Sequence, residues 1–110
     1  MASYSAEKII LATGSWLDKL LPDLELNLTV ERQQVIYLKV DKPNLHSMAK
    51  MPIFVSRDPK AMVYGFPLID SPTAIKVANH LSAPKIDIDQ RSFDFDQARA
   101  QNTAAQVRSF

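Results

Sequence analysis

Residues 61–66 read AMVYGF and residues 73–80 read TAIKVANH, and these two stretches decide the fold of the chain. Both are rich in β-branched, aromatic and other apolar side chains, which predicts two strands. A third strand is predicted over residues 52–56, and the intervening residues 57–60, RDPK, suit a hairpin turn because aspartate and proline favour turns. Three strands joined by short links predict an antiparallel meander.

The remainder of the chain predicts further strands and helices around this meander. Residues 7–14 contain an apolar run that ends at a glycine, which is typical of a strand buried on both faces. Ser15 is expected to cap a short helix over residues 16–21 that Pro22 ends. The other predictions are a long strand over 28–40, a surface connection over 41–51 and a helix over 94–107. The predicted class is α+β, with a mixed, mostly antiparallel sheet and a few flanking helices.

The composition narrows the possible functions. The 110 residues suffice for one modest core, and 46% hydrophobic with 23% charged residues is ordinary for a globular domain. A net charge of +1, with basic residues scattered along the chain, predicts binding to neither nucleic acid nor a membrane surface. No apolar run reaches the roughly 20 residues of a membrane-spanning helix, and the N-terminus lacks a secretory signal pattern. The chain has no cysteine, which excludes thiolate chemistry and fits a cytoplasmic protein.

Three motifs stand out against this background. Residues 12–16 read ATGSW and residues 64–67 read YGFP. Lys76 lies in an otherwise apolar run and His80 follows four residues later, so a strand would direct both side chains to one face. In their order along residues 7–87, these motifs resemble the substrate-binding half of flavin amine oxidases, the family of sarcosine oxidase and N-methyltryptophan oxidase.

The resemblance implies chemical roles for residues of the meander. Lys76 would be the catalytic lysine that lies over the flavin ring and assists reduction of dioxygen, because a fixed positive charge stabilises negative charge developing on oxygen. Tyr64 and His80 would bind the substrate. Each residue also has a plainer interpretation, in which Lys76 reaches solvent from an exposed strand, Tyr64 is a core or edge aromatic and His80 is a surface residue.

The glycine turn is the second part to which the resemblance gives a role. Thr13, Gly14 and Trp16 would pass beneath the adenine half of FAD, where glycine allows a close approach of the backbone. The plainer interpretation is a buried strand followed by a turn glycine. Gly65, beside two aromatic residues, likewise suggests a place where a ligand approaches the backbone.

The resemblance also implies that the chain is excised from a two-domain α/β flavoprotein. Residues 1–22 would supply the last strand and short helix of the dinucleotide-binding domain, and residues 23–110 part of the substrate-binding domain. The sequence lacks the GxGxxG unit that would hold the FAD pyrophosphate, and its final helix stops without a cap, which suggests truncation. The isolated chain is expected to bind no FAD, to be inactive and to self-associate through its exposed domain interface.

The implied reaction of the parent protein is oxidation of a secondary amine such as sarcosine or another N-methyl amino acid. Hydride would pass to FAD, water would hydrolyse the imine, and dioxygen would leave as peroxide. Two alternatives stay open: an amine dehydrogenase with another acceptor, and a small independent α+β binding or scaffolding module. No metal is expected, because His46 has no second ligand at useful spacing, and the aspartates of residues 87–96 suit a strand edge and a helix N-terminus.

Overall fold

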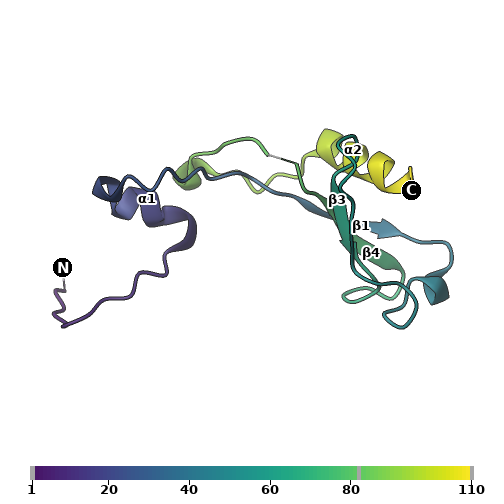
Figure 1. Cartoon of the computed structure of the whole chain (residues 1–110), viewed down its shortest axis with the longest axis horizontal. Helices are drawn as coiled ribbons and strands as arrows, with labels where there is room; N and C mark the ends of the chain where they lie inside the picture. Colours follow the sequence, from purple (N-terminus) through teal and green to yellow (C-terminus); the bar gives the residue numbers. More distant parts are fainter. Residues whose placement is uncertain (1, 82, 110) are drawn as a thin grey trace.

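A four-stranded sheet and one helix form one end of an elongated molecule (Figure 1). The computed structural model describes residues 2–81 and 83–109; Met1 and Phe110, which bounded the predicted domains, lie outside this part. The molecule measures 56 × 27 × 26 Å, and its radius of gyration is 18.8 Å. A compact domain of this length would have a radius of gyration of about 13 Å. The N-terminal third therefore extends away from the sheet instead of packing on it.

The sheet has the strand order β1-β4-β3-β2, and every pairing is antiparallel. The strands are β1 (Val35–Lys39), β2 (Phe54–Val55), β3 (Val63–Phe66) and β4 (Ala74–Asn79). The predicted meander is confirmed in β2, β3 and β4, and β1 adds to its far edge against β4. The structure is thus α+β, as the sequence predicts, although each strand is shorter than its predicted range.

The link between β2 and β3 is the predicted hairpin turn. The backbone N–H of Lys60 donates to Oδ1 of Asp58 at 2.9 Å, and the N–H of Ala61 donates to the carbonyl of Asp58 at 2.9 Å. A short acidic side chain that satisfies the backbone two residues ahead is a common stabiliser of turns. The turn fixes the register in which Phe54 faces Gly65.

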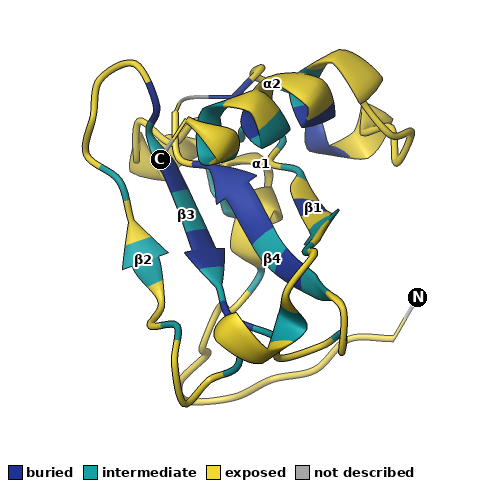
Figure 2. Ribbon diagram, turned by 90° about the vertical axis from the view of Figure 1, so that its right-hand side faces the viewer, coloured by how far each residue is buried: buried dark blue, intermediate teal, exposed yellow. Residues whose placement is uncertain are grey.

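Helix α2 (Gln97–Arg108) packs across one face of the sheet (Figure 2). Asp96 caps its N-terminus by accepting a hydrogen bond from the N–H of Arg99 at 2.9 Å, in keeping with the predicted acidic helix start. The buried core between helix and sheet consists of Ile36, Ile75, Val77 and Ala100. Ile36 and Ile75 alternate with more exposed neighbours, so most of the opposite face is open, although Ala78 on that face is buried.

Gly65 lies on this covered face, where the sequence suggested a ligand approach. A Cβ atom at this position would lie 2.5 Å from Cε1 of Phe54 and 2.9 Å from Cγ1 of Val77. The space beside the Gly65 backbone is therefore filled by the aromatic ring of Phe54. The prediction of a ligand at this glycine is wrong, because Phe54 is brought opposite it by the β2–β3 pairing.

The predicted buried strand over residues 7–14 is absent. The chain has no regular structure there, and Ile9 and Ile10 are 76% and 93% exposed. A strand covered on both faces needs paired neighbours, and among the described residues no backbone pairing joins this segment to another strand. The following segment forms η1 (Gly14–Trp16), α1 (Leu17–Leu20) and η2 (Pro22–Leu24). The expected cap by Ser15 is also wrong, since α1 has Trp16 at its N-cap and no side-chain cap bond.

The predicted strand over residues 28–40 is present only in its second half, as β1. Upstream of it, the chain runs alongside the segment around Lys85. The N–H of Arg32 donates to the carbonyl of Pro84, and the N–H of Ile86 donates to the carbonyl of Val30, both at 3.0 Å. These two segments of the chain form a narrow ribbon that connects the sheet to the end of the molecule that carries α1 (Figure 1).

The remaining short elements are η3 (Pro43–Leu45), within the predicted surface connection, and η4 (Ile88–Gln90), near the α1 end. Among the described residues, no helix is long and apolar enough to span a membrane.

Candidate functional site on the open sheet face

The face of the sheet opposite α2 carries the predicted lysine. We call it the open face and define it by Val35, Tyr37, Tyr64, Phe66 and Lys76, with His80 at its edge against the ring of Tyr64. The register places Lys76 opposite Tyr37 on β1 and opposite Phe66 on β3. Lys76 thus stands between two aromatic residues in the middle of the sheet. It is neither buried nor fully free, because its side chain is 37% exposed.

Asp70, in the loop between β3 and β4, pairs with Lys76. The Nζ atom of Lys76 donates to Oδ2 of Asp70 at 3.3 Å, and the hydroxyl of Tyr37 donates to the same oxygen at 3.0 Å. The hydrogen bond to Asp70, followed by the nearby charges, raises the pKa of Lys76. The hydrogen bond from Tyr37 and then that from Lys76 lower the pKa of Asp70. Both groups are therefore held in their charged forms.

Tyr64 and His80 form the aromatic part of the site. Their rings meet edge to face, with centroids 5.9 Å apart and an interplanar angle of 88°. Phe66 meets the other side of Tyr64 in the same manner, at 6.1 Å and 86°. The backbone N–H of His80 donates to the carbonyl of Met62 at 2.7 Å, which extends the β3–β4 pairing by one residue beyond β4. His80 is exposed and Tyr64 half-buried, so neither belongs to the core.

The structure therefore places three of the six predicted residues on one face of the sheet, where Tyr64 and His80 are in contact and Lys76 pairs with Asp70 instead. They share one open face that offers a positive charge, a phenol and an imidazole. Such a set could bind and orient a small polar molecule against the sheet.

Thr13, Gly14 and Trp16 lie at the other end of the molecule, beside α1 (Figure 1). Gly14 adopts a left-handed φ of +55°, and a Cβ at its position would meet nothing within 4 Å. Oγ1 of Thr13 is shielded from solvent and has no hydrogen-bond partner among the described residues. An exposed glycine turn beside an unpaired hydroxyl fits the approach of a polar ligand.

Trp16 is held by its own chain. Its Nε1 donates to Oδ1 of Asp89 at 2.9 Å, and the guanidinium of Arg91 lies 5.0 Å from the centre of its ring. Lys19, one turn later, forms ion pairs with both Asp87 and Asp89. These contacts attach α1 to the segment around η4. Trp16 thus has a structural role, because it helps to attach α1 to the segment around η4.

Two residues of the site, Asp70 and Tyr37, were not identified from the sequence. Asp70 lies in a segment that the sequence marks only as a loop, and nothing in its neighbourhood indicates a charged partner. Tyr37 lies 39 positions before Lys76, so their adjacency depends on the β1–β4 register. An aromatic residue on an alternating strand was the available signal, but it does not say which strand lies next to it.

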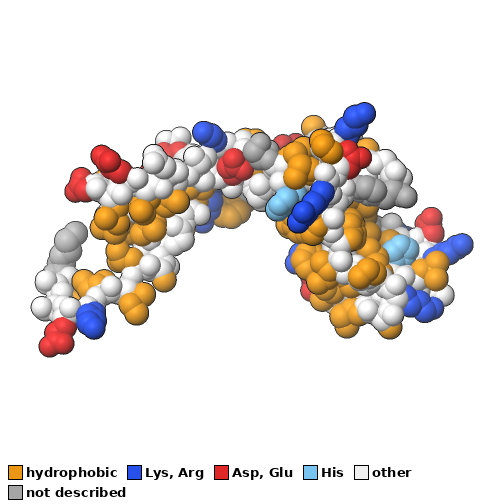
Figure 3. Space-filling model, viewed as in Figure 1, with side chains coloured by type: hydrophobic (Ala, Val, Ile, Leu, Met, Phe, Trp, Pro, Cys, Tyr) orange, Lys and Arg blue, Asp and Glu red, His pale blue; other side chains and the backbone are white. Residues whose placement is uncertain are grey.

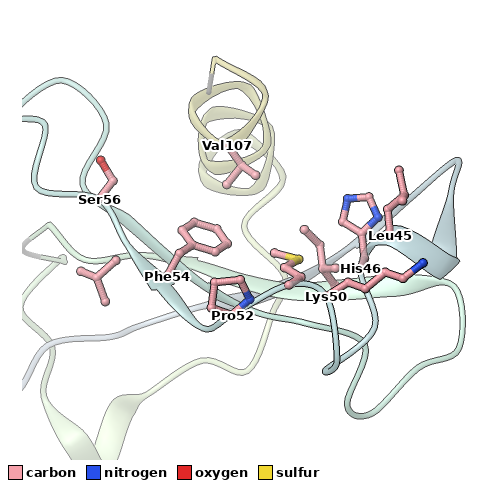
Figure 4. A pocket seen from close by; sticks show the side chains of 10 residues that line it. Leu45, His46, Lys50, Pro52, Phe54, Ser56 and Val107 are labelled. Carbon is pink, nitrogen blue, oxygen red and sulfur yellow. The ribbon is translucent and has the colours of Figure 1, made fainter.

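A cavity lies on the other face of the sheet from these residues, beneath the C-terminal turn of α2 (Figure 4). It has a volume of about 640 Å³ and is largely apolar. Phe54 and Val107 line it, with His46 and Lys50 at one side. Among the described residues, no group of three or more histidine, cysteine, aspartate or glutamate side chains could hold a metal ion.

No model of a protein family matches the chain. Three relatives named monomeric sarcosine oxidase do match it, each over 95 residues, or 84% of this chain. The protein from Bacillus sp. (strain B-0618) is 32% identical, and those from Bacillus sp. (strain NS-129) and Arthrobacter sp. (strain TE1826) are 30% identical. The aligned part is 24% of each relative's length. The chain is therefore a sarcosine oxidase-like sequence, and it corresponds to about a quarter of the length of the relatives it matches.

Proposed function

We propose that this chain is the part of an FAD-dependent amine oxidase on which the substrate and the flavin ring meet. The reaction is oxidation of a secondary amine, such as sarcosine or another N-methyl amino acid, with dioxygen as the acceptor. The observation that carries the proposal is the common position of Tyr64, Lys76 and His80 on the open face. Sequence similarity to proteins named monomeric sarcosine oxidase supports the same assignment.

In this proposal, each open-face residue has a distinct task. Lys76 supplies a fixed positive charge, which stabilises negative charge that develops on oxygen. The edge-to-face contact of Tyr64 and His80 fixes the two rings relative to each other, so that the phenol and the imidazole can orient a small amine. Bound flavin supplies the redox chemistry, because it accepts hydride from the amine and returns electrons to dioxygen.

The turn at residues 13–16 is proposed to hold the adenine half of the cofactor. The shielded hydroxyl of Thr13 and the open space at Gly14 support the proposal. The adjacent Trp16 keeps its structural contact with Asp89.

The isolated chain is proposed to be inactive and to self-associate. Its apolar side chains gather along the inner side of the bend between the two ends of the molecule (Figure 3). Exposed apolar surface of this kind normally meets another domain or chain. The proposal also includes the cytoplasmic location expected from the sequence, which imaging of the tagged parent protein tests.

The deciding experiment is Lys76→Met in a full-length protein that contains this sequence. Stopped-flow absorbance follows flavin reduction by sarcosine without oxygen, and then reoxidation by oxygen. We expect reduction to persist and reoxidation to slow by roughly 100-fold or more, the loss typical of removing one preorganised electrostatic group. Lys60→Met, in the exposed hairpin turn, is the matched control and should leave both rates unchanged.

The other outcomes separate the alternatives. Unchanged reoxidation in the Lys76→Met variant would overturn the role of this lysine. A wild-type protein that is reduced by amine but reoxidised only by another acceptor would be a dehydrogenase. If no flavin is bound and no amine is oxidised by the full-length protein, an independent α+β binding or scaffolding module becomes the better assignment.

A further inference from the structure

We propose that Asp70 is a positioning residue for Lys76, and that Tyr37 holds Asp70 in place. The inference rests on the proposed function, because it concerns the same lysine. It identifies the Tyr37–Asp70–Lys76 arrangement as the unit that fixes the ammonium group on the open face. Neither Asp70 nor Tyr37 has a role in the sarcosine oxidase-like motifs described above.

Lys76 and Tyr37 share one hydrogen-bond acceptor, the carboxylate of Asp70. Oδ2 of Asp70 accepts one hydrogen bond from Lys76 at 3.3 Å and another from Tyr37 at 3.0 Å. A lysine side chain has several rotatable bonds and loses rotamer entropy when it is fixed. A single carboxylate that also bonds to the neighbouring strand restricts this freedom. The ammonium is thereby tied to β1 as well as to its own strand.

The loop that carries Asp70 is itself held in place at both ends. At its start, the N–H of Leu68 donates to the carbonyl of His46 at 2.9 Å. At its end, the carbonyl of Thr73 accepts from the N–H of Val40 at 3.0 Å. Pro67 and Pro72 further restrict the backbone between these points. The carboxylate of Asp70 is therefore presented from a loop whose two ends are hydrogen-bonded to other parts of the chain, the segment after η3 and the residue after β1.

The strength of the ion pair between Lys76 and Asp70 depends on its surroundings. In water, an ion pair between exposed side chains contributes little, and here both side chains are more than a third exposed. A group that covers the open face would lower the local dielectric and strengthen the same interaction. The ion pair between Lys76 and Asp70 is thus strongest when another group covers the open face, which is the state in which the proposed reaction occurs.

Other titratable groups face Lys76 less directly. They are Lys39 on β1, Tyr64 on β3 and His80 after β4. Lys39 is a like charge on the same side of the sheet, since it pairs with Ala74, two positions from Lys76. Asp70 is the acidic group in contact with Lys76, so it is the group whose removal should change the behaviour of the ammonium.

The test needs no bound cofactor in its first part. The protonation of Lys76 in this chain is followed by NMR of lysine side chains between pH 7 and pH 12. The signal is assigned by its loss in Lys76→Arg. We expect its titration to shift to lower pH in Asp70→Asn, and to shift in the same direction but less in Tyr37→Phe. Asp70→Glu should restore most of the wild-type titration. Asp41→Asn, an exposed aspartate in the loop after β1, is the control and should leave it unchanged.

The second part uses the full-length protein with its flavin. The rate of reoxidation by oxygen is measured against pH, and we expect its alkaline decline to move to lower pH in Asp70→Asn. A merely structural role for Asp70 would change the amount of folded protein but not the pH of this decline. If Asp70→Asn misfolds, Tyr37→Phe retains the ring and provides the same readout.

The two proposals can fail separately. If Asp70→Asn and Tyr37→Phe leave both the Lys76 titration and the pH profile unchanged, the positioning role is overturned. That result leaves the proposed function intact provided that Lys76→Met still slows reoxidation. Conversely, a shifted titration together with normal reoxidation in Lys76→Met would retain the arrangement and overturn the role of Lys76 in reoxidation.

Discussion

Asn79, the last residue of β4, donates a hydrogen bond from Nδ2 to Oε1 of Gln106 on α2 at 2.7 Å. Its Oδ1 accepts a second bond, from the N–H of Leu81, also at 2.7 Å. Asn79 is 7% exposed, so these partners satisfy an amide that lies in the interface between sheet and helix. The same bonds fix the chain on either side of His80, and so connect the core to one edge of the site.

We therefore expect Asn79→Ala to lower the free energy of unfolding by about 1–3 kcal/mol, because it leaves buried groups without partners. Urea unfolding followed by circular dichroism measures the loss. Asn44→Ala, an exposed asparagine in η3, should change stability by less than about 0.5 kcal/mol. Equal losses in the two variants would show that the amide contributes nothing specific.

Gly65→Ala tests the contact between β2 and β3. A new Cβ would lie 2.5 Å and 2.7 Å from two ring atoms of Phe54, so the ring must move. Overpacking of this kind typically costs about 1–3 kcal/mol. Adding Phe54→Leu should recover part of the stability that Gly65→Ala loses. Urea unfolding of the single and double variants decides this, and additive losses would contradict the proposed clash.

The attachment of α1 should depend on pH. Lys19 lowers the pKa of both Asp87 and Asp89 below the ordinary 3.8, and the hydrogen bond to Asp87 leads in raising the pKa of Lys19 above 10.5. The carboxylates stabilise the folded contact above their unfolded pKa, and this is lost as pH falls through their folded pKa values. The lysine contribution is lost as pH rises through its folded pKa. Docking should thus be constant from about pH 5 to pH 9 and weaken below pH 3.8.

Trp16 reports this directly, because it is the only tryptophan in the chain and contacts Asp89. Its emission should be unchanged at neutral pH and should change below pH 3.8. Lys19→Met should give an acid-like emission already at pH 7. Lys50→Met, far from α1 along the chain, is the control. An emission spectrum that is identical in Lys19→Met and wild type would contradict the ion-pair attachment.

Self-association of the isolated chain should depend on its exposed N-terminal apolar residues. Ile10 is 93% exposed, and Ile10→Glu should reduce the mass measured by light scattering at high concentration. Ile53, which is 60% exposed near β2, provides a matched control substitution, Ile53→Glu. A wild-type chain that remains monomeric at high concentration would refute self-association altogether.

The meander was predictable because its signals are local. β-Branched and aromatic runs mark the strands, and the turn at Asp58 follows from the side chain's own backbone bonds. The helix and its acidic start were predictable for the same reason, since Asp96 bonds within its own first turn. By contrast, the apolar run at Ile9 and Ile10 reads as a buried strand only if something covers it, and local sequence does not reveal a covering partner.

The open face was partly predictable. Lys76 and His80 share a face because they are four residues apart on an extended chain. The union of Lys76 with Asp70 and Tyr37 was not predictable, since it requires the order of strands in the sheet and the path of a loop. Thr13 and Trp16 were recognised as a motif, but their separation from the meander depends on the long ribbon at residues 28–34.

The alternation along β1 and β4 makes α2 responsible for more than stability. A slip of one position between these strands would exchange the partners of Lys76 and turn opposite sides of the two strands toward each other. The helix opposes that slip because Ile36, Ile75 and Val77 must all face it. A helix on one face of the sheet thereby decides which side chains are available for chemistry on the other face.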